Sequence, residues 1–126
     1  EIIVKRFVMG QDSGAGSNPD GIRNQLEGQT LQGMSRALRE EVRWSDGGVT
    51  SVDWRRYAAL KFGDKMPEMV SVVLDRREYR PMGCGEGPVT IAAAAIGNAV
   101  FDATGARLRE VPFTPDRVLE ALKARA

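Results

Sequence analysis

The chain has 126 residues, of which 42% are apolar, and its 18 basic and 17 acidic residues leave a net charge of +1. This length and composition are typical of one globular domain over residues 1–126, and no basic block marks a nucleic-acid-binding surface. No apolar run is long enough to cross a bilayer. With no histidine and one cysteine, Cys84, the chain cannot by itself build a disulfide, a structural zinc site or an iron–sulfur cluster. A metal or redox centre would need ligands from other polypeptide.

The first predicted elements are a strand at residues 1–8 and a helix that follows a Gly- and Ser-rich loop. The segment Asn18-Pro19-Asp20 predicts the helix start, because it combines an N-cap side chain, a proline in the first turn and a nearby acid. The helical pattern continues to about Glu41. Since the chain opens with Glu1 inside a strand, and no signal peptide precedes it, we expect a fragment or cleaved product of a longer polypeptide.

The predicted first helix has an apolar face and two glycines. The apolar residues that share one sector, and so predict the core face, are Leu31, Met34, Leu38 and Val42. Gly28 and Gly33 weaken a helix relative to alanine, so both predict close packing of the backbone against another element. Glu27 falls in the apolar sector, which indicates either a buried, paired carboxylate or an irregular start of the helix.

The middle of the chain predicts a β-hairpin and a further strand. Residues 42–54 are typical of a hairpin around the turn Ser45-Asp46-Gly47-Gly48. Trp44 and Trp54 flank that turn, and we interpret them as a cross-strand or core pair and not as a ligand platform. Residues 55–68 are ambiguous. A strand is predicted at 69–74, and a charged, solvated loop follows at 76–80.

Pro88 predicts the start of a second helix, which ends near Thr104 with Gly105 as its stop. Its side chains are apolar or small nearly all round, which is typical of a helix enclosed by other elements, and we expect other polypeptide to supply much of that cover. Residues 107–111 suggest a short strand, and Thr114-Pro115-Asp116 begins a last amphipathic helix. Segregated strands and two or three helices favour an α+β fold.

The strongest candidate for chemistry is Glu86, in the loop Gly83-Cys84-Gly85-Glu86-Gly87-Pro88. Glycines let a backbone approach another molecule closely, and the following helix N-terminus offers free amides. A carboxylate held in this way can serve as a general base. From spacing alone, the commoner alternatives are a helix-capping carboxylate or a loop charge in solvent, because motifs this short often match by chance.

Two further groups of residues are candidates. Gln25, Gln29 and Gln32 form a column on the first helix, with Arg36 alongside; amides suit a flat, heteroatom-rich ligand, although a solvated helix face is the commoner explanation. Cys84 is either a redox-sensitive thiol or a small buried residue, and the second is favoured because no basic neighbour promotes the thiolate.

Three segments together resemble a known family. They are Asn18-Pro19-Asp20 with Asn24-Gln25-Leu26-Glu27-Gly28 and Gln32-Gly33, then Gly83-Cys84-Gly85-Glu86, then Ala94-Ala95-Ile96-Gly97-Asn98-Ala99-Val100-Phe101-Asp102-Ala103-Thr104-Gly105. Over nearly its whole length the chain resembles the C-terminal end of the molybdopterin-binding large subunit of the xanthine dehydrogenase/aldehyde oxidase family. The segment Val49-Thr50-Ser51-Val52-Asp53-Trp54 makes it most similar to bacterial nicotinate dehydrogenase and isoquinoline oxidoreductase subunits.

The resemblance implies specific roles. Glu86 matches the family's general-base glutamate, Gln25 matches a glutamine that binds the pyranopterin, and Cys84 and Gly85 match residues that line the cofactor. It further implies a fragment of the molybdenum-binding domain, the cytosine dinucleotide form of the molybdenum cofactor, no metal ligand in this chain and a small-molecule N-heteroaromatic or aldehyde substrate. The implied partners are the remainder of the large subunit and an iron–sulfur subunit. A cytoplasmic location is expected, with a periplasmic one left open.

The match has departures, and one rival interpretation stands beside it. Position 84 is more often Val, Ala or Ile in the family, and Gly87 stands where Pro, Ala or Ser is frequent. By itself the chain is expected to be inactive. The rival is a non-catalytic, truncated tail that forms homo-oligomers or binds partners through apolar surface.

Overall fold

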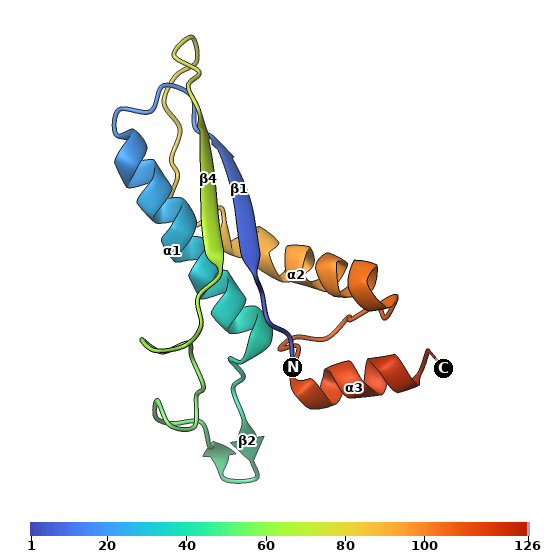
Figure 1. Cartoon of the computed structure of the whole chain (residues 1–126). Coiled ribbons are helices and arrows are strands. Elements are labelled where there is room, and N and C mark those ends of the chain that lie inside the picture. Colours follow the sequence, from blue (N-terminus) through green and yellow to red (C-terminus); the bar gives the residue numbers. More distant parts are fainter. Residues whose placement is uncertain (126) are drawn as a thin grey trace.

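The computed structural model describes residues 1–125 of the chain. Its elements, in chain order, are β1 (Arg6–Asp12), α1 (Pro19–Leu38), β2 (Trp44–Ser45), β3 (Gly48–Val49), β4 (Glu68–Leu74), α2 (Val89–Thr104) and α3 (Pro115–Lys123). Separate small sheets and three helices confirm the predicted α+β class (Figure 1). Within residues 1–125, none of the helices combines the length and the apolar character that a membrane crossing requires.

A parallel pair of strands, β1 and β4, forms the larger sheet, and α1 is part of the connection that joins them in the chain. Phe7 and Met9 are buried on the sheet face that packs on the helices, whereas Val8 points to the opposite face and is 66% exposed. The predicted first strand, at residues 1–8, is misplaced, because its pairing with β4 begins at Arg6 opposite Glu68. Residues Ile2 and Val4 pack against the core without belonging to a strand. Periodicity alone cannot show where a strand finds its partner.

Helix α1 begins where predicted and ends earlier than predicted. Asn18 accepts a hydrogen bond from the amide of Gly21 at 2.9 Å, which caps the first turn. At the other end the amides of Arg39 and Glu40 both donate to the carbonyl of Ser35, at 3.0 and 3.2 Å, and the helix stops at Leu38. The predicted core face is correct at Met34, which is buried, and at Leu31 and Leu38, which are partly buried against the core. Val42 lies beyond the helix and is 45% exposed.

The crossing of α1 with α2 depends on Gly33. A Cβ atom at this position would lie 2.6 Å from the Cβ of Ala92 and 2.9 Å from the carbonyl oxygen of Val89. The prediction of close packing is thus confirmed at Gly33. It is wrong at Gly28, where, apart from the backbone of α1 itself, no atom of residues 1–125 lies within 4 Å of the equivalent point.

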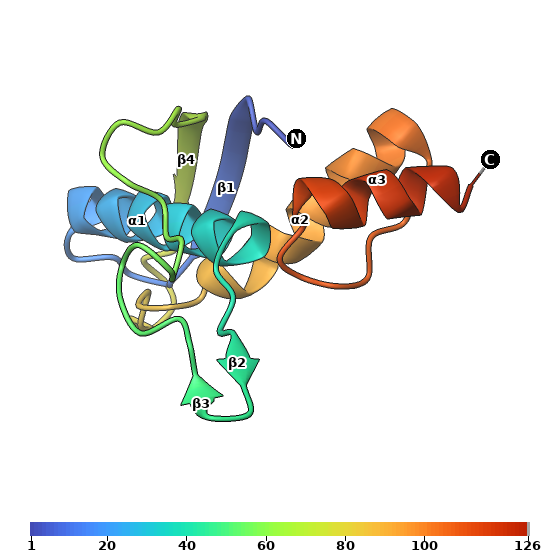
Figure 2. The same ribbon diagram turned by 90° about the horizontal axis from the view of Figure 1, so that it is seen from below.

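The predicted hairpin is present but very short. Trp44 pairs with Val49 across the turn, and the chain leaves the hairpin before Trp54. The prediction of a tryptophan pair is wrong: Trp44 and Trp54 are 71% and 75% exposed, and Trp54 instead contacts Tyr57 edge to face at 6.2 Å between ring centroids. Figures 1 and 2 both show the hairpin projecting beyond the C-terminal end of α1, away from β1, β4 and α2.

Helix α2 packs on α1 along one side only. Ala92, Ile96, Gly97 and Val100 are buried, whereas Ile91 and Phe101 are 58% and 41% exposed. Gly105 ends the helix in the left-handed conformation, with φ of 70°, as predicted. The short strand predicted at 107–111 does not form. Among residues 1–125 that segment has no strand partner, and the guanidinium of Arg107 stacks on the ring of Phe101 at 3.8 Å.

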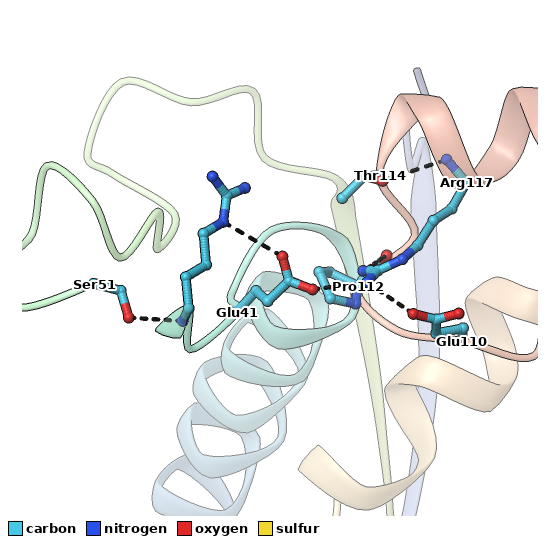
Figure 3. A network of polar contacts seen from close by, with 7 residues as sticks. Glu41, Ser51, Glu110, Pro112, Thr114 and Arg117 are labelled. Carbon is cyan, nitrogen blue, oxygen red and sulfur yellow. Dashed lines mark hydrogen bonds and ion pairs between the residues drawn. The ribbon is translucent and has the colours of Figure 1, made fainter. Parts of the chain in front are cut away.

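The last helix, α3, is fixed to the end of α1 by Arg117 (Figure 3). Its guanidinium contacts Glu41 at 2.7 Å and Glu110 at 2.8 Å, and it donates to the carbonyl of Pro112 at 3.0 Å. Thr114 caps the helix by accepting from the amide of Arg117. These contacts raise the pKa of Arg117 and lower the pKa of the Glu41 carboxyl, chiefly through the hydrogen bond between them.

Candidate functional site

The glycine loop connects the charged segment after β4 to the first turn of α2. Glu86 lies three residues before Val89, at the N-terminal end of α2, and is exposed. The N-cap of α2 is Pro88, without a side-chain cap, and the hydroxyl of Thr90 instead donates to the carbonyl of Gly87 at 2.7 Å. Of the alternatives for Glu86, a helix-capping carboxylate is therefore not what the structure contains. Glu86 is an exposed residue of the loop, which agrees with the alternative of a loop charge in solvent.

Neither backbone conformation nor close packing within the described residues requires the glycines around Glu86. A Cβ atom at Gly83, Gly85 or Gly87 would have no neighbour within 4 Å, and none of the three has a positive φ. By contrast, Gly14 in the neighbouring loop has φ of 67° and lies against the carbonyl of Arg80. Open space beside three clustered glycines leaves room for another molecule to approach the backbone closely.

A hollow of about 330 Å³ lies beside this loop. Two segments far apart in sequence form it, and they are tied together by backbone hydrogen bonds from Met82 to Ser13 at 2.8 Å and from Ala15 to Tyr79 at 3.1 Å. Its lining combines the loop before α1, the first turns of α1 and the segment before the glycine loop: Ser13, Ala15, Gly16, Ser17, Asn18, Gly21, Ile22, Gln25, Pro81, Met82 and Cys84.

The structure brings together two of the four predicted site residues in this hollow. Gln25 and Cys84, which are 59 positions apart, both line it. Gln25 is exposed, whereas Cys84 is partly buried and packs against the core, in agreement with its interpretation as a small packed residue. Gly85 and Glu86 are exposed and immediately follow Cys84 in the chain. They are therefore next to the hollow in sequence, although they do not line it.

Sequence reasoning missed Ser13. This residue is 2% exposed, lines the hollow, and its hydroxyl has no hydrogen-bond partner among residues 1–125. A buried hydroxyl without a partner costs free energy, so a polar ligand that entered the hollow would find a donor and acceptor already in place. A lone serine in a Gly-rich loop carries no signal that could have singled it out.

The remaining glutamines behave differently from one another. Gln32 is exposed, as a solvated helix face predicts, but Gln29 is partly buried and its amide oxygen Oε1 has no partner in the described part of the chain. Glu27 is partly buried and accepts a hydrogen bond from Ser71 of β4 at 3.3 Å, which supports the paired-carboxylate alternative. Across residues 1–125, no three Cys, Asp or Glu side chains gather as a metal-binding group.

A family model described as "Molybdopterin cofactor-binding domain" matches residues 1–66, about half of the chain. The class of domain is thus one that binds the molybdopterin cofactor. A relative from Pseudomonas putida, one of the subunits of nicotinate dehydrogenase, is 43% identical over 97% of this chain and 10% of its own length. The chain therefore belongs to the xanthine dehydrogenase/aldehyde oxidase family of molybdenum hydroxylases.

Other relatives agree with this family and differ in their described activities. A membrane-bound aldehyde dehydrogenase from Gluconacetobacter polyoxogenes, whose name includes pyrroloquinoline quinone, is 39% identical over 97% of this chain and 16% of its own length. The crystal structure of quinoline 2-oxidoreductase from Pseudomonas putida 86 superposes with a TM-score of 0.82 over 94% of this chain and 16% of that chain, at 24% identity. That similarity establishes the fold alone. The chain spans between a tenth and a sixth of the length of these proteins.

Proposed function

We propose that this chain is part of a molybdenum hydroxylase that hydroxylates an N-heteroaromatic compound or an aldehyde with oxygen derived from water. The observation that carries this proposal is that the exposed Glu86 follows, two positions later in the chain, Cys84 of the hollow that Gln25 and Ser13 also line. The substrate classes come from relatives whose names include nicotinate and aldehyde.

The residues of the hollow suit part of a pterin. A pterin is flat and carries several nitrogen and oxygen atoms, and the amide of Gln25 can both donate to and accept from such atoms. The unpartnered Ser13 hydroxyl adds a further donor and acceptor, and the open backbone at Gly85 allows close approach. Cys84 closes the hollow on the side of the core. When bound, the molybdenum cofactor supplies the two-electron oxidation chemistry, which none of these side chains can perform.

Glu86 is the residue to which we assign the proton transfer. Its carboxylate is a proton acceptor, and a general base must be within hydrogen-bond reach of the proton that it removes. Glu86 is exposed and therefore accessible to another molecule, and its loop leads directly into α2. We assign Glu86 the role of removing a proton from the water-derived group that becomes the new hydroxyl of the product.

The rest of the proposed enzyme lies outside this chain. Because the chain spans about a tenth of its nicotinate dehydrogenase relative, we propose that the remainder of the large subunit makes most cofactor and substrate contacts. We further propose the cytosine dinucleotide form of the cofactor, iron–sulfur clusters in a partner subunit and a cytoplasmic location. One cysteine cannot hold such a cluster. The isolated chain is accordingly expected to be inactive.

A non-catalytic tail that associates with itself or with other proteins is the second candidate. The observation in its favour is the number of large apolar side chains on the surface, among them Val8, Ile91 and Phe101. The DNA upstream of the codon for Glu1 separates the two candidates. Several hundred in-frame codons or an adjacent large-subunit gene support the enzyme, and a start codon and a stop codon at the boundaries of this chain without such a gene support the tail.

The test of the catalytic assignment is Glu86→Gln in the complete assembly. Removing a general base is expected to lower turnover by about 10²–10⁴-fold. Molybdenum and pterin contents, measured by elemental analysis and by fluorescence of the released pterin, should not change, because the amide keeps the shape of the side chain. Glu78→Gln, in the exposed charged loop, is the matched control and should retain full turnover. Full activity of the Glu86→Gln assembly would refute the assignment.

A further inference from the structure

The hairpin and the segment that follows it expose a group of residues of unusual composition. We call it the tryptophan–arginine surface, and it consists of Arg43, Trp44, Val49, Val52, Trp54, Arg55 and Arg56. The apolar members are between 47% and 75% exposed, and Figure 2 shows the hairpin standing clear of the rest of the chain. Neither the cofactor site nor the proposed general base involves these residues.

The two tryptophans are not used to stabilise the fold. A tryptophan side chain usually buries about 150–250 Å², and that burial is its main contribution to stability. In the described part of the chain, Trp44 pairs with Val49 across a hairpin with two residues in each strand, and Trp54 contacts the ring of Tyr57. The hairpin is held mainly by polar contacts, from the amide of Arg43 to the hydroxyl of Ser51 at 3.0 Å and from the amide of Thr50 to the carbonyl of Arg43 at 2.8 Å. The exposed tryptophans therefore need a role outside this chain.

The charge beside the tryptophans is positive. A hollow of about 440 Å³ is lined by three arginines and two hydroxyl-bearing residues, namely Arg43, Arg55 and Arg56 with Thr50 and Ser51, together with Ala58. Two nearby carboxylates are already engaged. Asp53 accepts the amides of Arg55 and Arg56 at 2.9 and 3.0 Å. Glu41 contacts Arg117 at 2.7 Å and Arg43 at 3.5 Å, so Arg43 is already paired within the chain. Within residues 1–125, the guanidinium of Arg55 has no ion-pair partner and that of Arg56 has only the carbonyl of Thr50, at 3.5 Å.

We propose that the tryptophan–arginine surface docks an acidic segment of the polypeptide that completes the molybdenum-binding subunit. The carboxylates of that segment enter the arginine-lined hollow, and its apolar side chains cover Trp44 and Trp54. This inference rests on the proposed function, because it takes the missing remainder of the subunit as the partner. Charge complementarity selects the segment, since guanidiniums bind carboxylates through two parallel hydrogen bonds.

The composition of the surface favours a polypeptide over other anions. Tryptophan, tyrosine and arginine are the residues that dominate the binding energy of protein interfaces, usually as aromatic anchors surrounded by polar groups. A free inorganic anion would use the arginines and leave the tryptophans and Val52 exposed. Nucleic acid would need a wider basic surface, and the chain as a whole has a net charge of only +1.

The experiment places a photo-reactive benzoylphenylalanine at Val52, which is 66% exposed and leaves both tryptophans and all three arginines in place. The protein is expressed in its natural host and irradiated, and the crosslinked peptide is identified by mass spectrometry. The same residue at Arg77, whose side chain is 85% exposed on the loop after β4, is the matched control. The expected product is a crosslink, formed from position 52 and not from position 77, to a segment of the same subunit with at least two Asp or Glu residues.

A second arm tests the arginines. Arg55→Gln combined with Arg56→Gln should lower the crosslink yield from position 52 about tenfold, because it removes the charges that the segment pairs with. About 1 M salt, which shortens the screening distance to ~3 Å, should lower the yield in the unsubstituted protein. If circular dichroism shows that the double variant is unfolded, the salt arm decides. Neither arm depends on turnover, and the Glu86→Gln test leaves this surface intact, so the two proposals fail separately.

The following results would overturn the proposal: no crosslink above the level of the control position, a crosslink to a segment without carboxylates, or a yield that neither the arginine substitutions nor salt change. A product that joins two copies of this chain, or this chain to nucleic acid or to a different subunit, would overturn it as well.

Discussion

Ser35 is the side chain that joins the end of α1 to the segment after the hairpin. It is 5% exposed, its hydroxyl donates to Glu40 and it accepts the amide of Leu60 at 2.9 Å. Glu40 also accepts the hydroxyl of Tyr57 at 2.7 Å, and this bond raises the pKa of the tyrosine. These contacts between side chains and distant residues determine the position of residues 55–68. Hydrophobic periodicity does not reveal such contacts, so the sequence of this segment is ambiguous.

Ser35→Ala is expected to destabilise the chain by about 1–3 kcal/mol, because the amide of Leu60 and the carboxylate of Glu40 both lose a partner. Chemical denaturation measures the change. Ser45→Ala, at the exposed turn of the hairpin, is the matched control and should stay within about 0.5 kcal/mol of the unsubstituted chain. Equal denaturation midpoints for the two variants would contradict the role of Ser35.

Glu41 predicts a pH dependence of stability. Its pKa in the folded chain lies below the ordinary value of 4.5, first because of the hydrogen bond from Arg117 and further because of the charges of Arg117 and Arg43. Since the folded pKa is the lower one, the unfolded chain binds more protons in that interval and the stability rises with pH. The contribution is fully present above 4.5 and is lost as pH falls through the folded pKa.

The measurement is a thermal melt at several pH values between neutral and strongly acid. Glu41→Gln should lower the melting temperature at neutral pH and should also flatten its decline with acid. Asp64, whose pKa is lowered mainly by the amide of Lys61 and by Arg39, provides the comparison: Asp64→Asn should flatten the decline in the same direction. If the melting temperature of the Glu41→Gln chain falls with acid as steeply as that of the unsubstituted chain, Glu41 does not make this contribution.

At the scale of elements, the position of α2 on α1 depends on one glycine. Gly33 allows α1 and α2 to approach closely, because a Cβ atom there would lie 2.9 Å from the backbone carbonyl oxygen of Val89. Because α2 follows the glycine loop directly, the packing at Gly33 also fixes where Glu86 can lie.

Two glycine-to-alanine substitutions on the same helix should change the free energy of unfolding in opposite directions. Gly33→Ala forces the new methyl group against Ala92 and the backbone of Val89 and should cost about 1–3 kcal/mol, more than alanine gains in helix propensity. Gly28→Ala meets no atom within 4 Å and should stabilise the chain by up to about 1 kcal/mol. Denaturant titrations of both variants decide the matter, and a stabilised Gly33→Ala chain would contradict the close crossing.

At the scale of the whole molecule, the chain has too few elements to cover its own apolar surface. A parallel pair of strands ordinarily has both faces covered. Here the outer face of β1 and β4 exposes Val8, Val72 and Leu74 at 66%, 47% and 44%. The sheet therefore supports the proposal that further polypeptide completes the domain.

Lysine on this outer face should improve the behaviour of the isolated chain. Val8→Lys together with Val72→Lys should reduce concentration-dependent association, measured by sedimentation velocity. The two substitutions place charged side chains on an apolar sheet face that could otherwise pack against another chain. The melting temperature should change little, since exposed substitutions usually cost within about 0.5 kcal/mol. Glu1→Gln with Glu78→Gln raises the net charge by the same two units away from the strands and should leave association unchanged. If the unsubstituted chain and both double variants associate equally, the outer face of β1 and β4 does not mediate the association.

The starts of α1, α2 and α3 and the end of α2 can be predicted from the amino-acid sequence, because N-cap side chains, prolines and a positive-φ glycine act on residues close to them in the chain. The fold class follows from the order of the strand and helix patterns, and the family follows from the resemblance. Gln25, Cys84, Gly85 and Glu86 are also indicated there, through the resemblance and not through spacing. The pairing of β1, the crowding of Gly33 and not of Gly28, and the hollow that Ser13 and Gln25 share with Cys84 are visible in the folded chain alone. These features depend on contacts between residues tens of positions apart, and no local pattern in a single sequence records which distant segments meet.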